Sequence, residues 1–415
     1  MSVQHEHVLT QSLGSESFGF PASFFGRLLR LVLGRLECGE LTIETPSGDR
    51  LVFGGCRPGP QGRLVIHSWR FLGRLVPSWD IGFAEAYMAG EWSSPNLTAL
   101  LTLACRNNSM VEPMKALRLP RFGLRLRHAL NRNTRRGSRR NIAAHYDLGN
   151  EFYERWLDAG LTYSAGMFSS ANQTLEEAQE VKIDRVLTLL EPNVGDRVLE
   201  IGCGWGGLAE RLLQKCECTV TGVTLSAEQL AYAKHRLQAD ISTARCDLRL
   251  QDYRDVHGTF DRVVSIEMLE AVGEAYWSTY FEKLRDRLRP GGIAVLQVIT
   301  IDEDQFENYR RRPDFIQRYI FPGGMLPTTQ IIERKAGEAG LQLVAEEFFG
   351  EGYARTLELW RARFQDAWPD IKALGFDERF KRMWDYYLAY CQVGFEIRAL
   401  DVGLYKLVRA TKSYG

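Results

Sequence analysis

The stretch that decides the fold is Val-Leu-Glu-Ile-Gly-Cys-Gly-Trp-Gly-Gly, residues 198–207. Its first four residues predict a short buried strand, and the residues that follow the glycines, 208–215, predict a helix. Glycines between a strand and a helix let the backbone turn sharply and let a ligand approach it closely. The segment therefore predicts a cofactor site at the carboxyl end of a strand.

Strands and helices are expected to alternate on both sides of this turn. The predicted strands are 198–201, 219–223, 247–251, 260–265 and 293–299. The predicted helices are 175–190, 208–215, 227–237 and 276–288. This order predicts an α/β unit in which helices cover a parallel sheet.

Two details favour S-adenosylmethionine over a dinucleotide as the ligand. Glu200 lies two residues before Gly202, where methyltransferases often keep an acid, and Gly204 follows in the same turn. The next strand, 219–223, has no Asp or Glu at its end, where a dinucleotide ribose would need one. The turn is therefore interpreted as a binding site for S-adenosylmethionine.

Polar residues after the neighbouring strands supply further candidate contacts. Thr224, Ser226 and Gln229 can bind ribose hydroxyls, while Asp252 can accept from an adenine amino group. A second interpretation is open for one pair, because Ser226 can cap the following helix and Gln229 can complete a capping box. Both roles are compatible.

The chain has 415 residues, which favours two domains. Residues 20–110 read as a small α+β unit, with helices at 24–36, 81–88 and 97–105. From Lys115 to Arg140 there are ten basic residues and no acidic one. We expect an N-terminal domain over 1–114, a basic linker over 115–140 and a catalytic domain over 141–415.

The composition also excludes several classes of protein. The sequence contains no run of about 18 apolar residues, so no membrane-spanning helix is expected. Its N-terminus lacks the pattern of a secretory signal. The eight cysteines are scattered without metal-ligand spacing, so no metal site and a cytoplasmic location are expected. The basic linker is either a solvated connection or a contact with anionic lipid at the inner membrane face, each basic residue contributing about 1 kcal/mol there. Nothing indicates nucleic acid, and a homodimer is left open.

Six further motifs accompany the glycine turn in a fixed order. They are DIGFAEAYMAGEW (80–92), HYDLGNEFY (145–153), TYSAGMF (162–168), SIEMLEAVG (265–273), RYIFPGGMLP (318–327) and GYARTLELW (352–360). With this set, nearly the whole chain resembles the cyclopropane-fatty-acyl-phospholipid synthases. The resemblance implies a Rossmann-like S-adenosylmethionine methyltransferase domain with a small N-terminal α+β lipid-associated domain. The cofactor contacts it implies are Tyr163, Ser164, Gly202, Gly204, Thr224, Gln229 and Asp252.

The same resemblance implies a substrate and a reaction. A methyl or methylene carbon goes to the cis double bond of an unsaturated phospholipid acyl chain, and a carbocation on the chain closes to a cyclopropane. The protein must shelter that cation from water and remove one proton. Aromatic faces can stabilise it by about 0.5–2 kcal/mol each, and Trp205, Tyr319 and Phe321 are the candidates.

The residues that receive the proton depart from the family pattern. The best-known members pass it to a bicarbonate held by a Cys, a Glu, a His and a Tyr. Glu270 and Tyr319 match, whereas Ala165 stands at the Cys position and Gln297 at the His position. Two hypotheses stay open. Either bicarbonate is bound by Glu270, Gln297, Tyr319 and backbone N–H groups, or the proton passes directly to Glu270 or an ordered water.

The departure leaves other functions open. Proton loss elsewhere on the cation gives a methylene-branched chain, which a reductase could convert to a methyl branch. A small-molecule N-methyltransferase and an inactive lipid-binding protein are the remaining alternatives. The aromatic segment 386–407 is interpreted as core or as the wall of an acyl channel.

Overall fold

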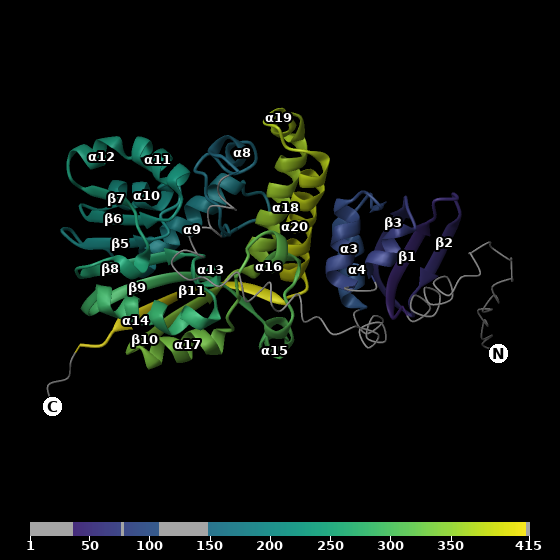
Figure 1. Ribbon diagram of the computed structural model, residues 1–415. Helices are drawn as coiled ribbons and strands as arrows, with labels where there is room; N and C mark the ends of the chain where they lie inside the picture. Colours follow the sequence, from purple (N-terminus) through teal and green to yellow (C-terminus); the bar gives the residue numbers. More distant parts are fainter. Residues whose placement is uncertain (1–35, 76–78, 108–147, 412–415) are drawn as a thin grey trace, which may run out of the picture.

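A computed structural model describes residues 36–75, 79–107 and 148–411. These residues form a four-stranded sheet with its helices near the N-terminus and a seven-stranded sheet with helices on both faces (Figure 1). The predicted linker 115–140 and most of the predicted helix 24–36 lie outside the described residues. The predicted domain limits therefore stay predictions.

The N-terminal unit is built on the sheet β2-β1-β3-β4. Its strands are β1 (Cys38–Glu44), β2 (Arg50–Gly54), β3 (Arg57–Ile66) and β4 (Trp92–Ser93). Its helices are α2 (Arg70–Leu75), α3 (Trp79–Met88) and α4 (Leu97–Arg106). Asn96 caps α4 by accepting from Ala99 N, and buried Asn107 accepts from Cys38 N, which fixes the end of α4 to the start of β1. The α+β prediction for this unit is confirmed.

The large sheet has the strand order β10-β11-β9-β8-β5-β6-β7. Its strands are β5 (Arg197–Ile201), β6 (Thr219–Thr224), β7 (Cys246–Leu250), β8 (Phe260–Ile266), β9 (Leu288–Ile301), β10 (Leu341–Phe348) and β11 (Leu400–Arg409). The prediction of a parallel sheet holds from β9 to β7, but β11 runs antiparallel to both of its neighbours. Strands β10 and β11 were not predicted from the sequence, in which 386–407 was interpreted as core or as the wall of an acyl channel.

Two apolar cores hold helices against the faces of this sheet. One face is covered by α9 (Leu175–Leu190), α10 (Gly207–Lys215) and α11 (Ala227–Arg236), and the other by α14 (Trp277–Arg287) and α17 (Thr329–Glu338), as Figure 1 shows. The smaller helices are α8 (Asn150–Glu154), α12 (Gln238–Ser242), α13 (Leu269–Val272), α15 (Glu303–Arg311), α16 (Phe315–Tyr319) and α19 (Trp368–Ala373). The arrangement is a Rossmann-like α/β fold, as predicted.

Two long helices lie between the large sheet and the N-terminal unit (Figure 1). They are α18 (Gly350–Asp366) and α20 (Glu378–Glu396). Tyr87 of α3 donates to the carboxylate of Asp385 at 2.6 Å, and Arg361 donates to the same carboxylate at 2.7 Å. Arg361 also donates to Thr98 of α4 at 3.1 Å. A polar network centred on the buried Asp385 therefore joins the N-terminal unit to the helices beside the large sheet.

Among the described residues, no helix is long and apolar enough to cross a bilayer.

Candidate functional site

The glycine turn at the end of β5 opens a cavity, as its sequence predicts. Gly202 N and Cys203 N both donate to Val223 O, at 2.9 and 3.1 Å, which turns the chain away from the sheet. Gly202 and Gly204 adopt φ values of +85° and +50°. A Cβ on Gly202 would lie 2.6 Å from the Met268 sulfur, so glycine serves both the backbone angle and the close approach.

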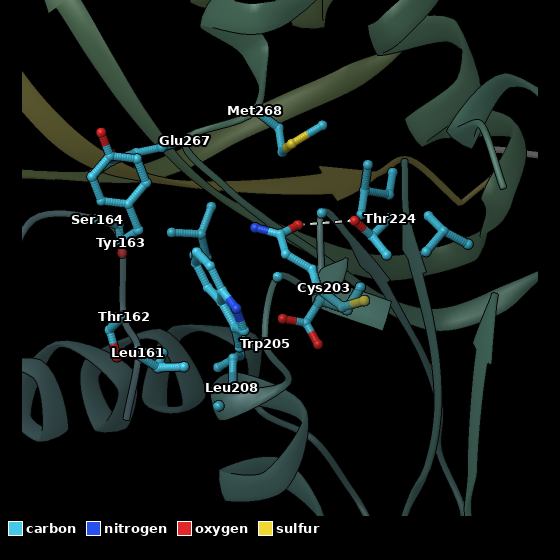
Figure 2. A pocket seen from close by; sticks show the side chains of 18 of the residues that line it. Leu161, Thr162, Tyr163, Ser164, Cys203, Trp205, Leu208, Thr224, Glu267 and Met268 are labelled. Atoms are coloured by element: carbon cyan, nitrogen blue, oxygen red, sulfur yellow. Dashed lines mark hydrogen bonds between the residues drawn. The ribbon is translucent and has the colours of Figure 1, made fainter. Parts of the chain in front are cut away.

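The cavity joins the residues of three sequence motifs. Figure 2 shows Tyr163 and Trp205 on one side, Thr224 on another, and Glu267 with Met268 above them. Seven of the eight predicted cofactor residues line it: Tyr163, Ser164, Glu200, Gly202, Gly204, Thr224 and Gln229. The structure therefore brings together most of the set that the sequence proposed for the cofactor.

The polar side chains after β6 are organised around Thr224. Its hydroxyl donates to the side-chain oxygen of Gln229 at 3.0 Å, drawn as the dashed line in Figure 2. Ser226 accepts from Gln229 N at 3.2 Å and so caps α11. Because the Gln229 amide bonds to Thr224, the reciprocal capping box that the sequence suggested does not form. Thr224 and Gln229 instead face the cavity as a preformed polar pair.

Asp252 is the predicted cofactor residue that does not line the cavity. Its carboxylate accepts from Arg254 N at 3.0 Å and forms a buried ion pair with the Arg254 guanidinium. Its neighbours Gln251 and Tyr253 reach the cavity instead. The Asp252 carboxylate is therefore paired with Arg254 and does not line the cavity. Its predicted contact with adenine stays a prediction.

Two buried titratable residues, Lys182 and Glu200, line the floor of the cavity. Lys182, on α9, donates to the Ser164 hydroxyl at 2.8 Å, and burial lowers the pKa of this lysine to about 8. Burial also raises the pKa of Glu200 to about 8, with the Lys182 charge acting in the opposite direction. One Glu200 oxygen, Oε2, is buried without a hydrogen-bond partner. A buried acceptor in this state fits a positively charged group of a ligand.

Glu267 stands at the centre of the hydrogen bonds next to this floor. Its Oε1 accepts from Ala165 N at 2.9 Å and from the Gln297 amide at 2.7 Å, and its Oε2 accepts from the Tyr353 hydroxyl at 2.8 Å. Burial raises the pKa of Glu267, and the three donors oppose that rise. Glu267 has a φ of +50°, a left-handed conformation that costs a non-glycine residue about 1–2 kcal/mol.

Two of the three predicted catalytic residues, Gln297 and Glu270, lie near Glu267, and the third, Tyr319, lies apart from them. Gln297 bonds directly to Glu267, and Glu270 lies on α13, where it accepts from Ile299 N of β9. Burial raises the pKa of Glu270 to about 8, and the Glu267 charge adds to that rise. Tyr319 is placed elsewhere: its hydroxyl donates to Glu85 of the N-terminal unit at 2.6 Å. In this structure Tyr319 therefore bonds to the N-terminal unit, and its role in the chemistry stays a prediction. The tyrosine whose hydroxyl bonds to Glu267 is Tyr353.

Aromatic side chains form the wall beside Glu267. Trp205 lines the cavity and donates to Asn150 at 2.8 Å, while its ring lies 5.1 Å from that of Tyr153. The Tyr163 and Tyr387 hydroxyls are 2.8 Å apart. Three aromatic residues were proposed from the sequence to face a cation. Trp205 lines the cavity, whereas Tyr319 and Phe321, which packs against Tyr387, are not part of its lining.

Sequence reasoning missed Glu267, Tyr353 and Lys182. Glu267 and Tyr353 belong to quoted motifs, SIEMLEAVG and GYARTLELW, so their motifs were noted but their roles were not. Lys182 lies in a helix that reads as amphipathic, and no local pattern marks it as buried. A search for buried charges that face a cavity would have found Lys182 and Glu267, and the hydrogen bond to Glu267 then identifies Tyr353.

Known proteins resemble the chain over this site and beyond it. The family model for mycolic acid cyclopropane synthetase matches residues 133–404. Tuberculostearic acid methyltransferase UfaA1 of Mycobacterium tuberculosis is 42% identical over 355 residues, 83% of each chain. Cyclopropane-fatty-acyl-phospholipid synthase of Escherichia coli is 36% identical, over 81% of this chain and 85% of that protein.

A solved structure is similar in the same region. Mycolic acid cyclopropane synthase CmaA1, crystallised with SAH and CTAB, has a TM-score of 0.61 and 30% identity. The likeness covers 65% of this chain and 98% of the CmaA1 chain.

Proposed function

Since the chain belongs to the mycolic acid cyclopropane synthetase family, we propose that it transfers a one-carbon unit to the cis double bond of an unsaturated phospholipid acyl chain and forms a cyclopropane. It is an S-adenosylmethionine-dependent methyltransferase. The observation that carries the proposal is a single cavity in which the glycine turn, an aromatic wall and a partly exposed carboxylate, Glu267, meet. That combination suits an apolar substrate that becomes charged during the reaction.

The residues of the cavity fit the methyl donor. S-adenosylmethionine, when bound, supplies an activated methyl group on a positively charged sulfur. Glu200 offers an unpartnered buried oxygen to a cationic group, and the Thr224–Gln229 pair offers polar atoms to ribose hydroxyls. Gly202 and Gly204 leave the backbone open to close approach.

The aromatic wall suits the alkene and the cation that follows from it. An alkene is neutral and needs no base before it attacks the methyl group. The carbocation that results must be kept from water, and the faces of Trp205 and Tyr163 offer it a polarisable surface. The protein then has to remove one proton at a defined carbon, which decides the product.

A methylene-branched or methyl-branched chain is the second candidate. It is favoured by the relative at 42% identity, which is named a methyltransferase, whereas the E. coli relative is named a cyclopropane synthase. Proton loss from the transferred methyl group closes the ring. A hydride shift before proton loss gives a methylene branch with the same elemental composition.

The phospholipid substrate implies a peripheral contact with an anionic membrane surface at the cytoplasmic face. The basic segment 115–140 is the proposed contact, and it lies outside the described residues. A small-molecule N-methyltransferase would need no such segment. Binding to vesicles of anionic phospholipid that falls with added salt is expected, because screening weakens contacts between exposed charges.

The test is mass spectrometry of the lipids of a host with and without the protein. We expect monounsaturated acyl chains to gain the mass of one CH2 group. Proton NMR then separates a cyclopropane from a methylene group, because their protons resonate in distinct regions. Unchanged acyl chains, together with turnover of a soluble amine, would refute the lipid proposal.

A further inference from the structure

We propose that the Glu267 carboxylate is the catalytic base of this enzyme, and that it occupies the site in which an exogenous anion such as bicarbonate would otherwise bind. This inference rests on the proposed function, because it requires a substrate cation that loses a proton. It also assigns a role to a residue outside the set that the sequence nominated.

The geometry around Glu267 is that of an anion-binding site already filled by the chain. Three donors converge on the carboxylate: Ala165 N, the Gln297 amide and the Tyr353 hydroxyl, at 2.7–2.9 Å. They come from the loop before α9, from β9 and from α18. Donors from three separate segments fix both oxygens, as a base requires if it is to meet one particular proton.

The carboxylate can still be reached from the cavity. Glu267 is partly exposed, and it lines the cavity together with Trp205 and Met268 (Figure 2). An ionised carboxylate offers about four acceptor sites, and three of those on Glu267 are used. The remaining site can accept a proton from a substrate carbon held against the aromatic wall.

The backbone at Glu267 supports a functional role. A φ of +50° places this glutamate in a conformation that glycine adopts freely and other residues rarely do. Such conformations persist where the surrounding structure holds them, and they concentrate at functional sites. Glu267 N is held by Gln297 O at 2.8 Å, so β9 fixes both the backbone and the side chain of this residue.

The same geometry disagrees with a bound bicarbonate. The donors available to it, Ala165 N, Gln297 and Tyr353, are all directed at Glu267. A second anion would lie beside the Glu267 charge and would compete with it for those donors. The residues present therefore do not fit bicarbonate, and no step is assigned to it.

The chemical step balances without a further reactant. The π pair of the alkene forms the new C–C bond as the S–CH3 bond breaks, and the chain becomes a cation. Glu267 then takes one proton, and the C–H electron pair becomes the third bond of the cyclopropane ring or the π bond of a methylene group. The resulting carboxylic acid passes its proton to water before the next turnover.

Glu270 offers a matched comparison, because it is a second partly buried carboxyl near Glu267, and its pKa is raised by burial and by the Glu267 charge. The experiment measures kcat with unsaturated phospholipid vesicles for E267Q and E270Q, and the affinity of each for S-adenosylhomocysteine. We expect E267Q to lose about 100-fold or more in kcat. We expect E270Q to lose less than about tenfold, since a glutamine carbonyl can still accept from Ile299 N. A larger loss in E270Q than in E267Q would overturn the proposal.

A second variant separates a chemical role from a structural one. E267G suits the backbone angle, removes the carboxylate and leaves the three donors in place. We expect it to be inactive in carbonate-stripped buffer and to regain turnover with added bicarbonate or formate. The wild-type enzyme should not respond to bicarbonate. Turnover by E267G without an added anion, or stimulation of the wild type by bicarbonate, would refute the assignment.

The outcomes also separate this inference from the proposed function. If the wild type forms no product from any unsaturated lipid, the proposed function fails. If the wild type forms product and E267Q does so at an equal rate, only the assignment of the base fails. Binding of S-adenosylhomocysteine and the thermal unfolding midpoint show whether each variant is folded.

Discussion

Cofactor binding should release a proton from Glu200. In the free protein, burial raises the pKa of this carboxyl to about 8, so about nine-tenths of the molecules carry its proton at pH 7. A positively charged ligand beside the unpartnered Oε2 favours the ionised form. Binding of S-adenosylmethionine at pH 7 should therefore release nearly one proton per molecule.

The pH dependence of the affinity follows from the same value. Only the ionised fraction of Glu200 is ready to bind, and that fraction rises from about one-tenth at pH 7 to about one-half at pH 8. The dissociation constant should accordingly fall about fivefold over this interval. Above pH 9 the curve should flatten, because the carboxyl is then ionised before the ligand arrives.

Titration calorimetry in two buffers with different ionisation enthalpies measures the released proton. The release should disappear in Glu200→Gln, and the pH dependence of the affinity should disappear with it. Lys182→Met is the matched control, because Lys182 also has a pKa of about 8 and could release a proton itself. Proton release that survives in Glu200→Gln and is lost in Lys182→Met would refute the assignment to Glu200.

Three further variants test the site. Tyr353→Phe removes the one hydroxyl that bonds to Glu267 Oε2 among the described residues. A hydrogen bond to a charged group is worth about 1.5–3 kcal/mol, so the acid limb of the kcat–pH profile should move up by about 1–2 units. An unmoved limb would contradict this. Tyr319→Phe should change kcat by less than about twofold. Because it removes the bond to Glu85, it should lower the free energy of unfolding, measured in denaturant, by about 1–2 kcal/mol. A large loss of kcat would show that Tyr319 takes part in the reaction. Gly202→Ala should weaken the binding of S-adenosylhomocysteine, measured by calorimetry, at least tenfold. The reason is that alanine is strained at a φ of +85° and its Cβ would clash with Met268. Undiminished affinity would show that the turn tolerates a side chain.

The sequence was most informative where local backbone geometry determines the structure. The turn at Gly202 and Gly204 requires left-handed angles that glycine permits, so its place between β5 and α10 could be read from the residues. The alternation of strands and helices likewise gave the fold class. It did not predict β10 or β11, because the aromatic-rich segment 386–407 was interpreted as core or channel wall, and β11 then pairs antiparallel with β9.

The composition of the proton-accepting group depended on packing that the sequence does not display. Tyr319 and Tyr353 both belong to motifs, and the folded arrangement of α16 and α18 determines that Tyr353 reaches Glu267. Glu267 and Glu270 are only three residues apart in the sequence. In the structure Glu267 has a left-handed backbone with a φ of +50°, and Glu270 does not. The replacement of Cys and His by Ala165 and Gln297 looked like a loss, yet both contact a carboxylate that the chain itself supplies.

Helix α20 contacts both the N-terminal unit and the wall of the cavity. Asp385 accepts from Tyr87 of α3, and Tyr386 packs its ring 5.8 Å from the Tyr87 ring. Two positions after Asp385, Tyr387 meets Tyr163 at the cavity wall. Residues within one turn of α20 thus contact both the N-terminal unit and the cavity wall. A chimera with the N-terminal unit of a relative would have to preserve the fit at Tyr87, or the displacement would be transmitted to the wall that surrounds the substrate.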